Sequence, residues 1–391
     1  MSFAVLAAIT IVALAGPLLA LPPRLHLPVM LGELLAGIAL GPTGVNQLHA
    51  SDPTFTFLAD VGFALVMFVA GSHVPVRDRR VRAALTAGIG RTAGVAGLSI
   101  LLGLALAKAF GTGHGLLYGV LMASSSAALV LPIVESLRLG GETVLQLLAQ
   151  VAIADAACIV ALPLVIDPAR ASRAAVGAVA VLACAAALFL ILRHFERTGL
   201  RRRVHHASGQ RKFALELRIN LAILFALAAI AQRTHVSIML AGFSFGMAVA
   251  GVGEPRRLAR QLFAVTEGFF GPLFFVWLGA SLDLHDLSRH PSFIALGLLL
   301  GTGTAITHAT MRATGQPIPI GGLAAAQLGV PIAAAALGTQ LNVLKPGEAA
   351  ALVLGALVTI GWATLCGAWA VRTGLTTPSP PAPAETTRPP H

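Results

Sequence analysis

The sequence contains little charge and few cysteines. Lys, Arg, Asp and Glu together make up 11% of the 391 residues, whereas soluble proteins carry roughly 25%. A chain with so few charged side chains cannot cover a globular domain with polar groups, which excludes an ordinary soluble enzyme. The three cysteines, Cys158, Cys184 and Cys366, all lie inside apolar stretches. We therefore predict neither a disulfide framework nor a metal site.

Hydrophobic residues, by contrast, make up 56% of the chain and come in long blocks. A helix that crosses a bilayer needs roughly 20 such residues. Lipid offers the backbone no hydrogen bonds, so each block must be helical. We therefore predict an all-α polytopic membrane protein with about 13 transmembrane helices. The blocks are 3–21, 27–46, 55–73, 83–110, 115–135, 143–166, 173–193, 213–231, 235–251, 258–282, 292–311, 319–342 and 347–371.

The basic residues indicate the topology of these helices. The net charge is +11, but most Lys and Arg residues fall in alternate loops, above all in 77–82 and 193–212. Cytoplasmic loops carry this excess of positive charge. We therefore expect a multi-pass protein of the inner (plasma) membrane, with its N-terminus outside and its C-terminus in the cytoplasm. Nucleic acid is not an expected partner.

Two segments of the first half recur in the second half. "LPVMLGELLAGIALG" from Leu27 resembles "VSIMLAGFSFGMAVA" from Val236, and "VMFVAGSHV" from Val66 resembles "FFVWLGASL" from Phe274. The offset is nearly constant, which favours an inverted repeat, a transporter architecture with its binding site near the bilayer midplane. Small residues at four-residue spacing, Gly37 with Gly41 and Gly242 with Gly246, predict closely packed helices.

The repeat defines a domain organisation. We predict one transmembrane exchanger domain over residues 1–373. It contains repeat one at about 3–166, a linking helix at 173–193 and repeat two at about 213–371. The Pro- and Thr-rich residues 374–391 are expected to form a disordered cytoplasmic tail, with no nucleotide-binding domain after it.

Two spans contain helix-breaking residues at matching places. The fifth span contains Ser124, Ser125 and Ser126 before Pro132, and the twelfth contains Gly329 and Pro331. Proline frees carbonyl groups, and interrupted spans in corresponding positions of two repeats indicate a binding site. We predict helix breaks at Pro132, Gly329 and Pro331. The three serine hydroxyls are predicted to support a cation site, although ordinary proline kinks would give the same pattern.

Asp155 is a carboxylate inside the sixth span. An ionised Asp at the bilayer centre costs about 2.5–3.5 kcal/mol, and intramembrane ionisable residues are usually functional. We predict that Asp155 binds a proton or a cation. The alternative is a structural carboxylate that is hydrogen-bonded to the nearby serines.

Five segments in order resemble the monovalent cation:proton antiporter-2 family, with its sodium/hydrogen exchanger domain. They are "LPVMLGELLAGIALGP", "LADVGFALVMFVAG", "ASSSAALVLPIV", "VSIMLAGFSFGM" and "GFFGPLFFVWLGASLDL". The resemblance runs from Leu27 to about Val371. It implies thirteen helices, a homodimer and a mobile core that carries the site in an elevator-like motion. It also implies that Asp155 is the ion- and proton-binding carboxylate.

The sequence departs from the family pattern in three places. Ala154 stands where the family has Asn or Asp, His308 stands where it has Lys or Arg, and "GVPI" replaces "prGe" on the twelfth span. Ala154 cannot ionise, and a buried histidine is mostly uncharged near neutral pH. We therefore expect one proton to exchange for one cation without net charge movement. His308 is predicted to be at most a pH-responsive partner of Asp155.

These observations predict a secondary active antiporter that exchanges H+ for Na+ or K+ and needs no cofactor. Two alternatives remain: an uncoupled channel or uniporter, and a membrane sensor of the same fold that has lost transport. An enzyme is not predicted. An intramembrane aspartyl protease would need a second catalytic aspartate, and the sequence offers no other aspartate in the middle of a predicted span.

Overall fold

The computed structural model describes residues 2–21, 29–72, 83–198, 215–234, 236–253, 256–282 and 284–375. Three predictions concern residues outside these ranges: the basic loop at 77–82, most of the basic loop at 193–212, and the tail from residue 376. Within the described ranges the chain is helical and contains no strand. The prediction of an all-α protein is confirmed.

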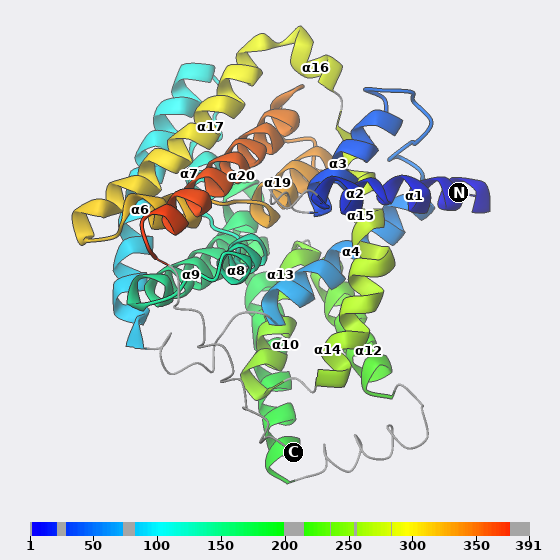
Figure 1. Ribbon diagram of the computed structural model, residues 1–391. Helices are drawn as coiled ribbons and strands as arrows, with labels where there is room; N and C mark the ends of the chain where they lie inside the picture. Colours follow the sequence, from blue (N-terminus) through cyan, green and yellow to red (C-terminus); the bar gives the residue numbers. More distant parts are fainter. Residues whose placement is uncertain are drawn as a thin grey trace, which may run out of the picture.

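The helices follow one another along almost the whole described chain (Figure 1). In order they are α1 (Phe3–Ala13), α2 (Ala15–Ala20), α3 (Val29–Leu40), α4 (Pro53–Ser72), α6 (Leu85–Phe110), α7 (Gly115–Ala123), α8 (Ala127–Ser136), α9 (Glu142–Val165), η1 (Pro168–Arg170), α10 (Ala171–Arg197), α12 (Leu215–Arg233), α13 (Ile238–Val252), α14 (Arg256–Val265), η2 (Thr266–Phe270), α15 (Gly271–Ser281), α16 (Leu284–Arg289), α17 (Pro291–Ala309), η3 (Thr310–Thr314), α18 (Ile318–Ala324), α19 (Gly329–Gln340) and α20 (Glu348–Arg372).

Ten helical segments in the described ranges are long and apolar enough to cross a membrane. Two further apolar helices, α3 and α13, have 12 and 15 residues, and α7 and α8 are separated by a break. Each of the thirteen predicted blocks coincides with one helix or with a run of consecutive helices. That all thirteen cross the membrane remains a prediction.

One group of helices, α3, α4, α13 and α15, packs through glycines. A Cβ atom on Gly37 would collide with the carbonyl of Val276 in α15, and one on Gly246 would collide with the carbonyl of Phe68 in α4. Backbones approach this closely only where side chains are small. The predicted close packing at both glycine pairs is confirmed. We call these four helices the glycine-packed group.

The pairing inside this group has a symmetry. Helix α3 packs on α15, and α4 packs on α13. Under the predicted repeat α3 corresponds to α13 and α4 to α15, so the repeat exchanges one pair with the other. This is the pattern that two related halves produce, although the repeat boundaries themselves remain a prediction.

The second group consists of α6 to α9 and α17 to α20, which lie together at the upper left of Figure 1. Helix α6 packs on α7 and α9, and α17 packs on α18 and α20. Helix α10 packs against α9 on one side and α13 on the other, so it joins the two groups. The second group contains both helix breaks, and we call it the crossing group.

Candidate functional site

The first break separates α7 from α8. Helix α7 ends at Ala123, and Ser124 and Ser126 have extended backbones before α8 begins at Ala127. Serine competes for backbone hydrogen bonds through its hydroxyl, which favours such an interruption. Pro132 is the sixth residue of α8, and the helix continues through it. The prediction that Pro132 marks the break is therefore wrong, because the serines interrupt the helix six residues earlier.

The second break separates α18 from α19. Helix α18 ends at Ala324, and α19 begins at Gly329 with Pro331 as its third residue. Proline fits the first turn of a helix because the N–H that it lacks has no partner there. Gly329 and Pro331 therefore mark the start of the second half-helix, immediately after the interruption at residues 325–328.

The two breaks cross and satisfy each other's backbone groups. The Ser126 N–H donates to the Ala326 carbonyl at 2.8 Å, and Ser125 Oγ donates to the Ala324 carbonyl at 2.5 Å. In return, Gln327 Nε2 donates to the Leu121 carbonyl at 2.5 Å. A broken helix in lipid is stable only where its freed backbone groups find such partners. The predicted pair of broken crossing helices is present.

Asp155 lies at this crossing. It belongs to α9, its side chain is 5% exposed, and its Oδ2 accepts the backbone N–H of Ala127 at 3.1 Å. Ala127 is the first residue of α8, where the partial positive charge of the helix dipole favours an anion. One N–H and one helix end leave most acceptor positions of the carboxylate unused. A buried carboxylate in this state needs a proton or a cation.

The three serines differ in what their hydroxyls do. Ser124 Oγ donates to the Leu121 carbonyl at 2.8 Å, and Ser125 Oγ donates across the crossing. Ser126 Oγ makes no hydrogen bond within the described ranges, and Ser126 directly precedes the residue that binds Asp155. All three are buried. Ser126 therefore has the hydroxyl whose oxygen is least committed to the protein.

His308 is buried in α17, with 1% of its surface exposed. Neither ring nitrogen has a hydrogen-bond partner of good geometry, and the Met122 backbone is the polar group beside the ring. No ion pair within 4.0 Å joins His308 to Asp155, both of which are described. The role of His308 as a pH-responsive partner remains a prediction.

Two residues of the crossing escaped the sequence analysis. The Gln327 N–H donates to Thr359 Oγ1 in α20 at 3.1 Å, and the Gln327 amide also contacts Ser124 and Thr304. An isolated glutamine two residues before Gly329, inside an apolar block, was a visible signal. Thr359 gave none, because threonines are frequent in these helices and most bond to their own helix.

One aspartate needs a correction. Asp60 lies in the interior of α4 and is half-buried. Asp60 is the eighth of the 20 residues of α4, so the prediction that no other aspartate lies in the middle of a span is wrong. Asp60 belongs to the glycine-packed group, where α4 packs mainly on α13 and α15, whereas α9 packs mainly on α6, α7 and α10.

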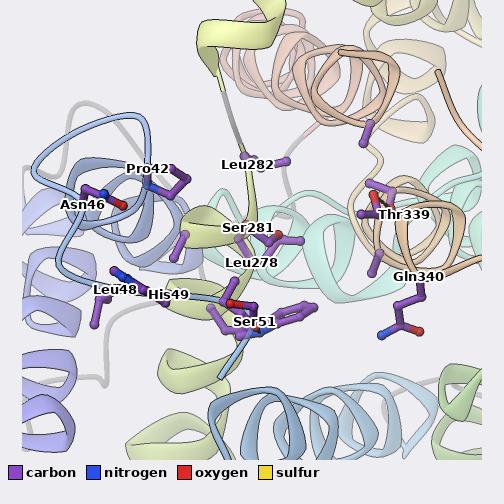
Figure 2. Close-up of a pocket in the computed structure, with 16 residues that line it drawn as sticks. Pro42, Asn46, Leu48, His49, Ser51, Leu278, Ser281, Leu282, Thr339 and Gln340 are labelled. Carbon is purple, nitrogen blue, oxygen red and sulfur yellow. Dashed lines mark hydrogen bonds between the residues drawn. The ribbon is translucent and has the colours of Figure 1, made fainter. Parts of the chain in front are cut away.

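A pocket of about 460 Å³ opens between the two groups of helices (Figure 2). Its walls come from the loop at 42–51, the end of α15, the second half of α19 and Ala349. The lining of α19 begins at Ala335, six residues after Gly329, which is roughly 9 Å along a helix. Neither Asp155 nor the residues of the two breaks line the pocket. This pocket therefore does not reach the crossing.

Comparison with known proteins identifies the family. Residues 9–373 match the family described as "Sodium/hydrogen exchanger, transmembrane". The chain belongs to this family. The match includes every helix of the crossing group, so the buried carboxylate and both breaks lie in the exchanger domain.

Individual relatives of this exchanger chain are distant. It is 30% identical to the Na(+)/H(+) antiporter NhaS5 of Synechocystis over 73% of this chain and 42% of the relative. It is 27% identical to the glutathione-regulated potassium-efflux system protein KefC of Cronobacter sakazakii, over 76% and 48% of the two chains. The chain thus spans about half the length of these curated relatives or less.

A solved structure shares the fold. The sodium proton antiporter MjNhaP1 from Methanocaldococcus jannaschii superposes with a TM-score of 0.59 at 16% identity. The superposition covers 94% of this exchanger chain and 97% of that chain. At this level of identity the likeness shows the fold alone.

Proposed function

We propose that this protein is a secondary active antiporter that exchanges H+ for Na+ or K+ at Asp155. The observation that carries the proposal is the Asp155 carboxylate, buried at the crossing of two broken helices and bound by a single backbone N–H. Family membership supports the proposal, and relatives with this domain are named as Na(+)/H(+) antiporters and as a potassium-efflux protein.

Competition for one carboxylate couples the two fluxes. With a proton or a monovalent cation bound, Asp155 is neutral, whereas the empty carboxylate is charged and costly to move through an apolar barrier. A hard cation needs several oxygen ligands. Ser126, which precedes the Ala127 that bonds to Asp155, supplies one such oxygen through its Oγ. Exchange follows because only a loaded site can change sides.

Alternating access uses the two groups of helices. We propose that the crossing group moves against the glycine-packed group, whose close backbone contacts make it a rigid scaffold. The pocket between the groups supports this division, because it lies where two moving bodies would part. The proposal includes a homodimer in the plasma membrane, with the N-terminus outside and the C-terminus in the cytoplasm.

The test is exchange by the purified protein in liposomes, followed with a pH-sensitive dye during pulses of Na+, K+ or Li+. Asp155→Asn should abolish cation-coupled proton movement while the protein still inserts. Asp167→Asn, just beyond the end of α9, is the matched control and should exchange normally. Exchange in Asp155→Asn would refute the assignment of the site. Cation flux without proton movement in the wild type would identify an uncoupled carrier instead.

A further inference from the structure

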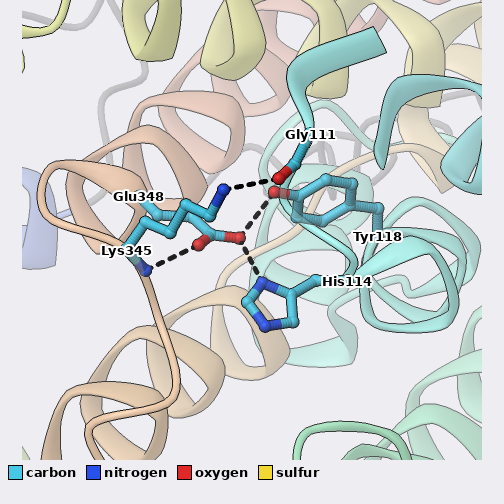
Figure 3. A network of polar contacts seen from close by, with 5 residues as sticks. All are labelled: Gly111, His114, Tyr118, Lys345 and Glu348. Carbon is cyan, nitrogen blue, oxygen red and sulfur yellow. Dashed lines mark hydrogen bonds and ion pairs between the residues drawn. The ribbon is translucent and has the colours of Figure 1, made fainter. Parts of the chain in front are cut away.

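A second buried carboxylate lies at the far end of α7 (Figure 3). Glu348, the first residue of α20, is fully buried. The Tyr118 hydroxyl donates to its Oε1 at 2.5 Å, and His114 Nδ1 lies 2.7 Å from the same oxygen. The Lys345 N–H donates to Oε2 at 2.8 Å. This buried carboxylate thus has three hydrogen-bond partners, whereas the Asp155 carboxylate has one.

A hydrogen bond from the Lys345 side chain adds to the contacts of Glu348. Lys345 Nζ donates to the carbonyl of Gly111, which ends α6 in the left-handed conformation at φ 62°. The connection from α6 to α7 is thereby bound to the connection from α19 to α20. We call Gly111, His114, Tyr118, Lys345 and Glu348 the Glu348 clasp.

The clasp and the crossing hold the same two helices at two places, the two ends of α7 and the start and the middle of α20. From His114 to Ser124 is ten residues, roughly 15 Å of helix, and from Glu348 to Thr359 is eleven residues, roughly 16 Å. At the crossing, Gln327 contacts Ser124 on one side and Thr359 on the other. Helix α7 and the first half of α20 are therefore tied to each other at two levels. A short helix transmits a displacement at one end to the other.

We propose that Glu348 is a positioning residue for the cation site, an inference that rests on the proposed function. By fixing the start of α7 to α20, it holds the serine break of α7 in register with the second break. The charge on His114 is not required, because both the neutral Nδ1–H tautomer and the imidazolium donate from Nδ1. The clasp therefore stays closed in both protonation states of His114.

The test compares two Glu→Gln variants at the first position of a helix. Glu348→Gln keeps the size of the side chain but replaces one of the two accepting oxygens by an NH2 group, which accepts no hydrogen bond, so that at least one partner loses its acceptor. We expect the apparent cation Km per folded transporter to rise about fivefold, which corresponds to about 1 kcal/mol. Glu142→Gln is the matched control. Glu142 is the exposed first residue of α9, and among the described residues its carboxylate bonds to Gln146 of its own helix. Its Km should stay unchanged.

A merely structural role gives a different result. It would lower the amount of folded protein, measured by size-exclusion chromatography, while the Km of the folded fraction stayed at the wild-type value. That outcome would overturn the proposal. If Glu348→Gln does not fold, Tyr118→Phe decides, because it removes one donor and should raise Km about twofold. An unchanged Km in Tyr118→Phe would then overturn the proposal.

Coupling to the site gives a second readout. Residues that act through one site give non-additive effects, so Glu348→Gln should raise Km less in a Ser126→Ala background than in the wild type. Full additivity of the two effects on Km would contradict positioning through the break.

Asp155→Asn separates the clasp inference from the proposed function. If it abolishes exchange while Glu348→Gln leaves Km unchanged, only the clasp inference fails.

Discussion

The two helix breaks solve the same structural problem with different chemistry. At the first break the Ala127 N–H is accepted by the Asp155 carboxylate, and at the second the Gln327 N–H is accepted by the Thr359 hydroxyl. Both distances are 3.1 Å. Ala127 is the first residue of α8, whereas Gln327 lies within the interruption before α19, and there a neutral hydroxyl is a sufficient acceptor. A freed N–H at the crossing thus does not require a charged acceptor, which favours a binding role for the Asp155 carboxylate.

The largest effect on exchange is expected when the carboxylate acceptor at the first break is replaced by a hydroxyl, the kind of acceptor found at the second break. Asp155→Thr replaces the carboxylate by a hydroxyl and so removes the group that binds protons and cations. The variant should insert and fold, and its cation-coupled proton movement in liposomes should be undetectable. If Asp155→Thr still exchanges cations for protons, the Asp155 carboxylate is not the shared site. The difference between the two acceptors would then have no role in transport.

Sequence alone predicted much of this fold because its signals are strong. Blocks of apolar residues set the helices, and glycines at four-residue spacing set the packing of α3 and α13. The carboxylate of Asp155 was conspicuous because nothing around it in sequence is charged. Pro132 misled the prediction because a proline inside a helix was given more weight than three consecutive serines.

The partners of the crossing could not be predicted from sequence. Ser126 pairs with Ala326 and Gln327 pairs with Thr359, contacts between segments 200 and 32 residues apart. Local pattern contains no information about which carbonyl faces which hydroxyl. The Glu348 clasp is similar, because His114 and Glu348 each sit beside an ordinary helix start and become a pair only when α7 and α20 are brought together.

A smaller effect is expected from the serines, and it sharpens the account of the first break. Replacing Ser124, Ser125 and Ser126 together with Ala should raise the apparent cation Km severalfold. Ser126→Ala alone should account for most of that rise, about fivefold or 1 kcal/mol, because only its hydroxyl is uncommitted. Ser124→Ala and Ser125→Ala are the matched controls. Equal effects of the three single variants would show that the uncommitted hydroxyl is not the ligand.

At the second break we expect an effect on stability and little on transport. Thr359→Val leaves the Gln327 N–H without its acceptor, which costs about 1–3 kcal/mol for a buried group. The apparent melting temperature in detergent should fall. The cation Km of the folded protein should change less than about twofold, because the Gln327 side chain keeps its bonds to the Leu121 and Ser124 carbonyls and so still holds the register of the two breaks. Thr364→Val, which loses only a bond to the Ile360 carbonyl of its own helix, should melt near the wild type. A large rise in Km in Thr359→Val would mean that the second break also contributes to binding.

The smallest expected effect is the response to membrane potential, which should be absent. Among the described residues of the crossing, Asp155 alone carries a carboxylate, while Gln327, Thr359 and Ser126 are neutral. An imidazolium at His308 would be buried without a partner, which is costly, so His308 has no proton to contribute near neutral pH. One proton then replaces one monovalent cation, and the loaded site is neutral in both directions.

The measurement is exchange in proteoliposomes whose potential is clamped with an ionophore, at neutral pH and at acid pH. At neutral pH, neither the rate of cation/proton exchange nor its equilibrium position should shift with the membrane potential. His308→Ala should behave like the wild type there, and should relieve inhibition only on the acid side, where an Asp155–His308 pair could form. A shift with imposed potential would show net charge movement. It would mean that a second ionisable group takes up or releases a proton together with Asp155. The exchange would then not be one proton for one cation, although the second break is neutral.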